Sequence, residues 1–199
     1  MTDNPEVSCE CAESDITFEA VSASESLSAT IRESIRNASV VFVPRSFREY
    51  ESPVFPVQTN EYFRFISSQI EQVELAVEDS DYVELALHGK ATRLGTLLVT
   101  LLIAPVVANL TAEYLKHHLG SAFGTSEVHA TIIVDNKNGH DSKSWSITYE
   151  GPATTFEQFV RDAIQKIPIQ HSSDEKASHR HQKQHGSPHP APAGTAPCK

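Results

Sequence analysis

The sequence predicts an α+β protein with a small mixed sheet, a C-terminal ββα unit and one long, fully apolar helix. The ββα unit, residues 127–167, is indicated by apolar residues that alternate along two segments and then recur at helical spacing. The long helix is indicated by residues 95–112, which include no charged side chain. A chain of 199 residues has room for one such domain with flanking tails.

Composition divides the chain into three parts. Residues 1–24 form an acidic, Ser-rich lead with few large apolar groups, which we expect to be disordered. Residues 25–170 form a single α+β domain that contains the apolar helix at 94–118. Residues 171–199 form a tail rich in His and Pro that has no apolar periodicity, and we expect it to be disordered as well.

The first elements of the domain follow from local patterning. Leu27, Ile31 and Ile35 are spaced as one stripe of an amphipathic helix that ends near Asn37. Residues 40–43 are four consecutive apolar residues, which predict a short buried strand.

A second helix and strand are predicted before the apolar stretch. Asn60 can cap a helix that continues toward Val77. Residues 82–88 alternate between apolar and polar side chains, which is typical of a half-buried strand.

The stretch 95–112 has to be buried, either in lipid or in protein. Read as a helix, it carries small side chains at every fourth position, a face that would let another backbone approach closely. This packing face consists of Thr96, Thr100, Ala104, Ala108 and Ala112. Pro105 lacks an N–H group, so we expect either a kink near Leu101 or two shorter segments that meet there.

Two placements of the apolar helix remain open. Its 18 residues reach the lower limit for a bilayer span, which favours a membrane-associated protein that faces the cytoplasm. In the alternative, the protein is soluble and cytosolic, and the helix packs in the core against a sheet of strands near residues 40, 83, 131 and 147.

The loop that follows residue 44 has the most distinctive combination of side chains in the sequence. Prolines hold it extended, and its aromatic and arginine side chains are suited to gripping a partner or an anionic ligand. The candidate interaction residues are Arg45, Phe47, Arg48, Tyr50 and Phe55. The simpler interpretation is that the aromatic rings fold back over the core.

Charge and motifs restrict the function. The chain has 26 acidic and 16 basic residues and a net charge of −10, so we expect no nucleic-acid partner. Its three cysteines fall in the polar termini, which suits a reducing compartment. Phosphate-binding, dinucleotide-binding, zinc-protease and hydrolase signatures are missing from the sequence, so we assign no catalytic, cofactor-binding or metal-binding residues.

The order of elements in the C-terminal half suggests a family. An apolar helix, a strand, a turn, a second strand and a closing helix are expected at residues 94–115, 131–134, 147–151 and 154–167. In this layout the chain resembles the small effector-associated modules of bacterial conflict and anti-phage systems. The resemblance includes no diagnostic motif and implies a non-enzymatic accessory that works beside an effector.

We therefore expect a non-enzymatic accessory protein that is membrane-associated or oligomerises through residues 95–112. Its partner would be another protein or a second copy of the chain, bound by the loop at 45–55. The alternative is a soluble protein-binding module with the apolar helix as its core. A third hypothesis, an enzyme that uses a histidine or carboxylate of this loop, requires an activity that depends on Arg45, Arg48 or Glu49.

Overall fold

Six strands form one mixed sheet in the order β1-β8-β7-β6-β2-β4. Their bounds are β1 (Ser8–Ser14), β2 (Val40–Val43), β4 (Val73–Leu75), β6 (Thr92–Thr100), β7 (Glu127–Asp135) and β8 (Ser144–Pro152). The pairs β6/β7 and β2/β4 are parallel, and the other neighbours are antiparallel. A short parallel pair, β3 (Phe55–Pro56) and β5 (Glu84–Leu85), lies outside this sheet.

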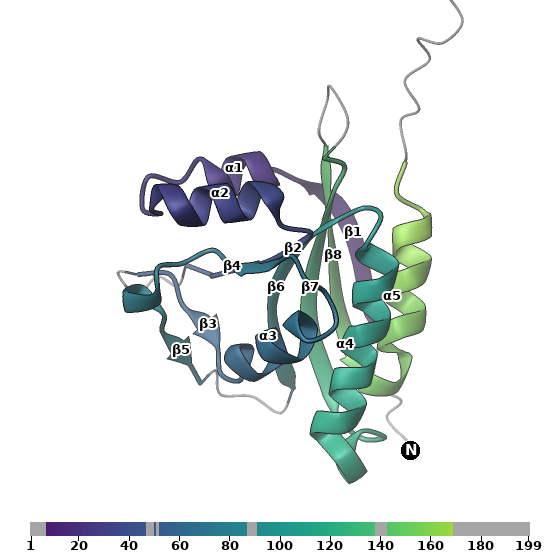
Figure 1. Cartoon of the computed structure of the whole chain (residues 1–199). Helices are drawn as coiled ribbons and strands as arrows, with labels where there is room; N and C mark the ends of the chain where they lie inside the picture. The colour runs from purple at the N-terminus through teal and green to yellow at the C-terminus, as the bar shows by residue number, and fades with distance from the viewer. Residues whose placement is uncertain (1–6, 47–49, 51, 87–90, 138–142, 169–199) are drawn as a thin grey trace, which may run out of the picture. The chain divides into compact units, whose positions relative to one another are not determined.

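Helices accompany the sheet on both faces, as Figure 1 shows, and the predicted α+β class is confirmed. The helices are α1 (Phe18–Ser22), α2 (Ala29–Asn37), α3 (Thr59–Ser67), α4 (Ala104–Leu119) and α5 (Phe156–Gln165), with short 3-10 turns η1 (Asp79–Asp81), η2 (Gly120–Ala122) and η3 (Ala153–Thr155). This computed structural model describes residues 7–46, 50, 52–86, 91–137 and 143–168. The predicted disordered tail, residues 171–199, lies outside the described residues.

The larger core lies between the sheet and helices α3, α4 and α5. Phe42 of β2, Leu97 of β6 and Ile132 of β7 supply its sheet side. Tyr62 of α3 and Phe156 of α5 are among the fully buried side chains that cover it. The α5 end of this core completes the ββα unit predicted for 127–167, whose two strands and helix are present.

A smaller core lies on the opposite face, under α1 and α2. It joins Phe18, Leu27 and Ile35 to the sheet residues Leu98 and Ile133. Ser28 accepts a hydrogen bond from the N–H of Ile31 and caps α2, which ends at Asn37 as the apolar spacing predicts. Because β6 and β7 are covered on both faces where α1 and α2 lie over the sheet, residues 97–99 and 132–134 are apolar on both sides.

The prediction of one continuous apolar helix at 94–118 is wrong. The first part of that stretch is β6, a central strand hydrogen-bonded to β2 and β7, and the second part is α4. The two segments meet at the turn 101–103, in agreement with the second option that Pro105 left open. Pro105 lies in the first turn of α4, where a missing N–H costs nothing. A strand that is buried on both faces has apolar residues at every position. Its sequence therefore cannot be told from that of a buried helix, and β6 followed by α4 gives one long apolar run.

None of the helices within the described residues has the combination of length and apolar composition needed to cross a membrane.

The prediction of a disordered lead at 1–24 is also wrong for its described part. β1 pairs with β8 along seven residue positions, and α1 follows it. β1 has few apolar side chains because it is an edge strand held by backbone hydrogen bonds, and Glu10 and Glu13 keep that edge polar. Cys9 is the β1 side chain that packs toward the larger core.

Two further elements differ from expectation. The helix that follows Asn60 does not reach Val77: α3 ends at Ser67, and the chain returns to the sheet as β4. The strand predicted at 82–88 is reduced to β5, which pairs with β3 and not with the main sheet, and residues 87 and 88 lie outside the described part. The strand expected near residue 83 is therefore replaced in the sheet by β6.

Candidate functional site

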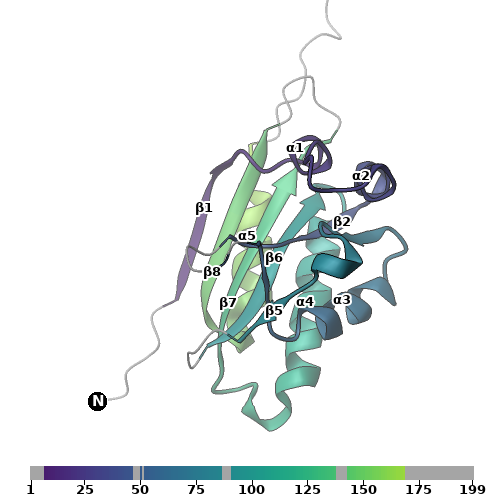
Figure 2. The same cartoon turned by 90° about the vertical axis from the view of Figure 1, so that its left-hand side faces the viewer.

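One face of the sheet is covered unevenly. α1 and α2 lie over one end of it, whereas Figure 2 shows β1, β8 and the adjoining part of β7 with no described helix in front of them. Because side chains alternate along a strand, the residues between those that enter the core point to this side. We call this surface the open face, and it consists of Ser8, Glu10, Ala12, His129, Ser146, Thr148 and Glu150, with Arg45 and Arg93 at its β6 side.

Arg45 anchors the β6 side of the open face. Its backbone pairs with Val54, and its Nε donates a hydrogen bond of 2.8 Å to Thr96 Oγ1. One of its Nη atoms donates to Thr131 Oγ1 at 2.5 Å. Thr96 and Thr131 are register partners on β6 and β7, so the guanidinium group lies across both strands. A guanidinium group has five N–H donors, and among the described residues the other three are left for a ligand.

A row of polar residues crosses the open face beside Arg45. The sheet register places Arg93, His129, Glu150 and Ser8 side by side on β6, β7, β8 and β1. Neighbouring strands are about 4.8 Å apart, so each of these side chains is within reach of the next. Along the row the charge changes from basic on β6 to acidic on β8.

Burial and the charges of this row shift the pKa values of His129 and Arg45. Burial lowers the pKa of His129, and Glu150 opposes that shift. The guanidinium groups of Arg45 and Arg93 lower the pKa of His129 further. Burial also lowers the pKa of Arg45, to which the positive charge of Arg93 contributes. The cationic side of the open face is thus a place where positive charges repel one another and where an added anion would be stabilised.

Acidic side chains collect on the other side of the open face. Glu10 on β1 and Glu150 on β8 are both exposed, and the small residues Ala12, Ser146 and Thr148 lie around them. A flat surface of small side chains lets another protein surface approach closely, and separate acidic and basic rows give such a contact a preferred orientation. The arrangement is suited to binding a macromolecule that carries the opposite order of charges.

Comparison with known protein families, curated proteins and solved structures found no match to this chain.

The structure places the predicted interaction residues in different environments. Arg45 lies in the open face, but its guanidinium is held by the sheet and is not free in a loop. Phe55 is 1 % exposed and stacks on Tyr82 at 5.2 Å, so the simpler interpretation applies to this ring. Tyr50 is 44 % exposed. Phe47 and Arg48 lie outside the described residues.

The predicted helix packing face is wrong as a single row. Thr96 and Thr100 belong to β6, whereas the three alanines belong to α4. Thr96 accepts the hydrogen bond from Arg45. Ala104 and Ala108 are fully buried in the larger core, where their small size lets α4 approach the sheet. Ala112 is partly buried against the same core.

Sequence reasoning missed several open-face residues. Glu10 was missed because its strand has no apolar pattern and is defined by its pairing with β8. His129 and Glu150 carried a usable signal, since polar residues alternate with apolar ones along both β7 and β8. The pairing of these two residues depends on the hairpin register, which the composition alone does not specify.

Within the described ranges, no group of three or more His, Cys, Asp or Glu side chains is placed to hold a metal ion. Cys9 and Cys11 are free thiols on β1, and burial raises the pKa of both.

Proposed function

We propose that this chain is a non-enzymatic interaction module that associates with a second copy of itself through the open face. The observation that carries the proposal is the separation of charge across that face. Glu10 and Glu150 lie on β1 and β8, whereas Arg45 and Arg93 lie toward β6, with His129 between the two rows. A surface with this order of charges is complementary to itself.

A two-fold axis that runs parallel to the strands, above the open face and between β7 and β8, brings the acidic row of one copy onto the basic row of the other. Such an isologous contact forms each ion pair twice, which is how closed dimers use one patch on both subunits. The small side chains in between, Ala12, Ser146 and Thr148, permit the two sheets to approach. The remaining N–H donors of Arg45 supply two-pronged contacts to a carboxylate.

The test is the oligomeric state of the full chain in sedimentation-velocity runs at low and high salt. We expect a dimer at low salt that dissociates as salt is raised, because exposed ion pairs are screened. Glu150→Lys places a cation in the acidic row and should give a monomer. Glu113→Lys on α4 makes the same charge change on an exposed residue away from the open face and should leave the dimer intact.

A charge exchange makes the test specific. Arg93→Glu alone should also give a monomer, and a mixture of the Arg93→Glu and Glu150→Lys chains should form mixed dimers. A wild-type chain that stays monomeric at low salt, or a dimer that Glu150→Lys leaves unchanged, defeats the proposal. Circular dichroism of each variant separates loss of association from loss of fold.

The effector partner implied by the resemblance to bacterial conflict modules is part of the same proposal and defines which protein to test first. The segment at 94–115, expected as a helix in that layout, consists of β6 and most of α4. An effector encoded beside this chain should bind wild-type protein in a pull-down. Glu150→Lys should weaken that binding if the effector uses the open face.

Membrane contact through 95–112 is a second candidate, favoured by a single observation. Leu102 is 89 % exposed in the turn between β6 and α4, and Val106 is 47 % exposed one helical turn later. Exposed apolar groups of this kind can enter the interfacial layer of a bilayer. In co-sedimentation with vesicles of phosphatidylglycerol and phosphatidylcholine, Leu102→Asp should reduce the bound fraction. Val83→Asp, an exposed apolar residue elsewhere, should not.

A further inference from the structure

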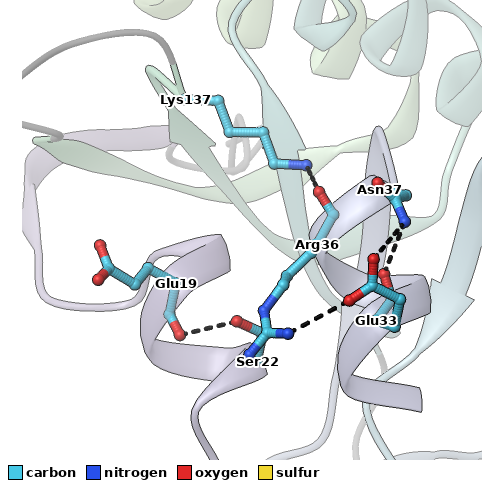
Figure 3. A network of polar contacts seen from close by, with 6 residues as sticks. All are labelled: Glu19, Ser22, Glu33, Arg36, Asn37 and Lys137. Carbon is cyan, nitrogen blue, oxygen red and sulfur yellow. Dashed lines mark hydrogen bonds and ion pairs between the residues drawn. The ribbon is translucent and has the colours of Figure 1, made fainter. Parts of the chain in front are cut away.

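A pocket of about 240 Å³ lies where β7 ends, beneath α1 and α2. Phe18, Glu19 and Ser22 of α1 line it together with Arg36 of α2 and with Asp135 and Lys137, residues at and just after the end of β7. We call it the Asp135 pocket. Figure 3 shows the polar contacts around it, with Lys137, Arg36 and Glu19 drawn from three separate segments.

Asp135 forms the floor of the pocket and is only 2 % exposed. Its Oδ2 accepts a hydrogen bond of 2.8 Å from the backbone N–H of Phe18. Its Oδ1 is buried and has no hydrogen-bond partner among the described residues. A buried carboxylate oxygen without a donor is costly, and a ligand that donates to it recovers that cost.

The electrostatics of Asp135 agree with this geometry. Burial raises the pKa of its carboxyl group, while the hydrogen bond from Phe18 and the positive charge of Lys137 act in the opposite sense. Asp135 and Lys137 are not joined by an ion pair, because no nitrogen–oxygen distance between them is within 4.0 Å. The carboxyl group therefore has a positive charge nearby but no ion-pair partner among the described residues.

Lys137 forms one side of the pocket mouth. Its Nζ donates hydrogen bonds of 2.7 Å to the carbonyl oxygens of Arg36 and Ala38 at the end of α2. The same nitrogen lies 4.0 Å from the centre of the Phe18 ring. An ammonium group has three N–H donors, so one remains after these two bonds.

Arg36 lies at the other side of the mouth and is exposed. Its guanidinium pairs with Glu33 at 3.3 Å, and Asn37 donates to the same carboxylate, as Figure 3 shows. Glu19 is exposed on α1, and its carbonyl accepts a hydrogen bond from Ser22. The pocket thus has a buried acceptor at its floor and two cations at its mouth.

This order of charges selects among ligands. A simple cation has to pass Lys137 and Arg36 before it reaches Asp135. A simple anion attracted by those two residues meets the carboxyl group of Asp135 inside. A small molecule with an ammonium group at one end and a carboxylate at the other satisfies both ends at once.

We infer that the Asp135 pocket binds a small zwitterion of the α-amino acid type, with its ammonium group on Asp135 Oδ1 and its carboxylate between Arg36 and Lys137. The volume fits a compact amino acid and not a nucleotide. This site is separate from the open face, so its test does not depend on self-association.

The experiment is a titration of the full ¹⁵N-labelled chain with L-alanine, followed by the backbone amide signals of Phe18 and Lys137. Ethylamine and propionate, which each keep one charged end of L-alanine, serve as matched probes. We expect saturable shifts with L-alanine and at least about tenfold weaker binding of either half-probe, since each loses a charge-assisted contact. Equal binding of ethylamine or of propionate, or no saturable shift with L-alanine, overturns the inference.

Two variants locate the site. Asp135→Asn keeps an oxygen for the Phe18 N–H but presents an amide donor to the ligand, so binding should weaken by about tenfold or more. Arg36→Gln should weaken binding of L-alanine several-fold without changing that of ethylamine. The matched control is Arg161→Gln, which removes a comparable exposed helix ion pair, with Glu157, on α5. Unchanged affinity for L-alanine in Arg36→Gln, or in a folded Asp135→Asn, contradicts the site. If Asp135→Asn fails to fold, the comparison of Arg36→Gln with Arg161→Gln decides alone.

Discussion

The side-chain carboxylate of Glu84 accepts a hydrogen bond from the backbone N–H of Asn60 at 2.8 Å, across 24 residues of sequence. The same carboxylate accepts a bond of 3.0 Å from the N–H of Gln58 and one of 2.6 Å from the Tyr82 hydroxyl. Gln58 precedes α3 with a left-handed backbone and provides no side-chain cap of its own. β5 therefore caps α3 from a distance, which ties the β3/β5 pair to the main fold.

Removing that cap should weaken the domain. Glu84→Gln retains the size of the side chain but not its charge, and we expect the free energy of unfolding at neutral pH to fall by about 1 to 2 kcal/mol. Urea denaturation followed by circular dichroism measures the change. Glu74→Gln, a glutamate on β4, is the control and should alter stability by less than about 0.5 kcal/mol. Equal effects of the two changes contradict the cap.

The contribution of Glu84 should depend on pH in a defined direction. Burial raises its pKa, but the hydrogen bonds from Tyr82, Asn60 and Gln58 outweigh this, and the pKa is lowered in the folded state. Since the folded form binds its proton less readily than the unfolded form, the stabilisation is present above the ordinary glutamate pKa and is lost as pH falls through the lowered value. The difference in stability between wild type and Glu84→Gln should therefore shrink on acidification. A difference that grows instead is evidence against this assignment.

The buried pair Tyr62 and Thr111 should be strongly non-additive. Their hydroxyls are 2.5 Å apart between α3 and α4, and Thr111 also donates to the carbonyl of Val107. Tyr62→Phe should cost about 0.5 to 1.5 kcal/mol, and Thr111→Val, which leaves a buried phenol unpaired, about 1 to 3 kcal/mol. The double variant should cost less than the sum of the two. A double-mutant cycle by chemical denaturation tests this, and strict additivity would show that the hydroxyls do not interact.

Arg45 should stabilise the sheet as well as form part of the open face. Arg45→Ala leaves the buried hydroxyls of Thr96 and Thr131 without their donor, and we expect a loss of about 1 to 3 kcal/mol. Arg45→Lys keeps the charge but cannot reach both strands with one planar fork, so it should recover less than half of that loss. Thermal unfolding of the three chains gives the comparison. Full recovery by lysine would mean that charge, and not the fork, is what matters.

Two glycines should respond to alanine to different degrees. A Cβ at Gly151 would lie 3.0 Å from the Tyr149 hydroxyl, which is held by the carbonyl of Pro152 and by Thr155. Gly151→Ala should therefore cost about 1 to 3 kcal/mol. A Cβ at Gly95 would meet its nearest atom, on Thr59, at 3.6 Å, so Gly95→Ala should lie within about 0.5 kcal/mol of wild type. Denaturant titrations of both variants decide, and equal losses would contradict the packing described for Gly151.

The division of residues 95–112 into a strand and a helix can be tested by two leucines. Leu98 is fully buried in β6, whereas Leu102 is exposed in the turn that follows. Leu98→Ala should cost about 2 to 5 kcal/mol. Leu102→Ala should change stability by less than about 0.5 kcal/mol. These positions are four apart and would share one face of a continuous helix, so similar losses at both would restore the helical interpretation.

Local patterns predicted much of the fold. The spacing of Leu27, Ile31 and Ile35 defines α2, and alternation along 127–135 and 144–150 defines the hairpin β7/β8 that α5 completes. In each case the signal arises from residues close in sequence that bury one side of one element. The β7 and β8 residues of the open face follow the same alternation, because the polar residues between the apolar ones point away from the core.

Other features required contacts between distant residues. β1 is a strand because β8 supplies its hydrogen bonds, and Arg45 belongs to the open face because Thr96 and Thr131 lie side by side. The cap on α3 likewise depends on Glu84, which lies beyond the next two elements. Neither apolar period nor turn chemistry encodes such pairings.

By itself, then, the sequence determined the α+β class, the C-terminal ββα unit and the fact that residues 95–112 hold much of the apolar mass. Tertiary structure decided that this mass is divided between a central strand and a helix, and that the acidic N-terminal segment joins the sheet edge. The physical reason is that an uninterrupted apolar run is buried equally well as a strand covered on both faces or as a core helix. Only the partners β2 and β7, which satisfy the backbone N–H and C=O groups of β6, settle that choice.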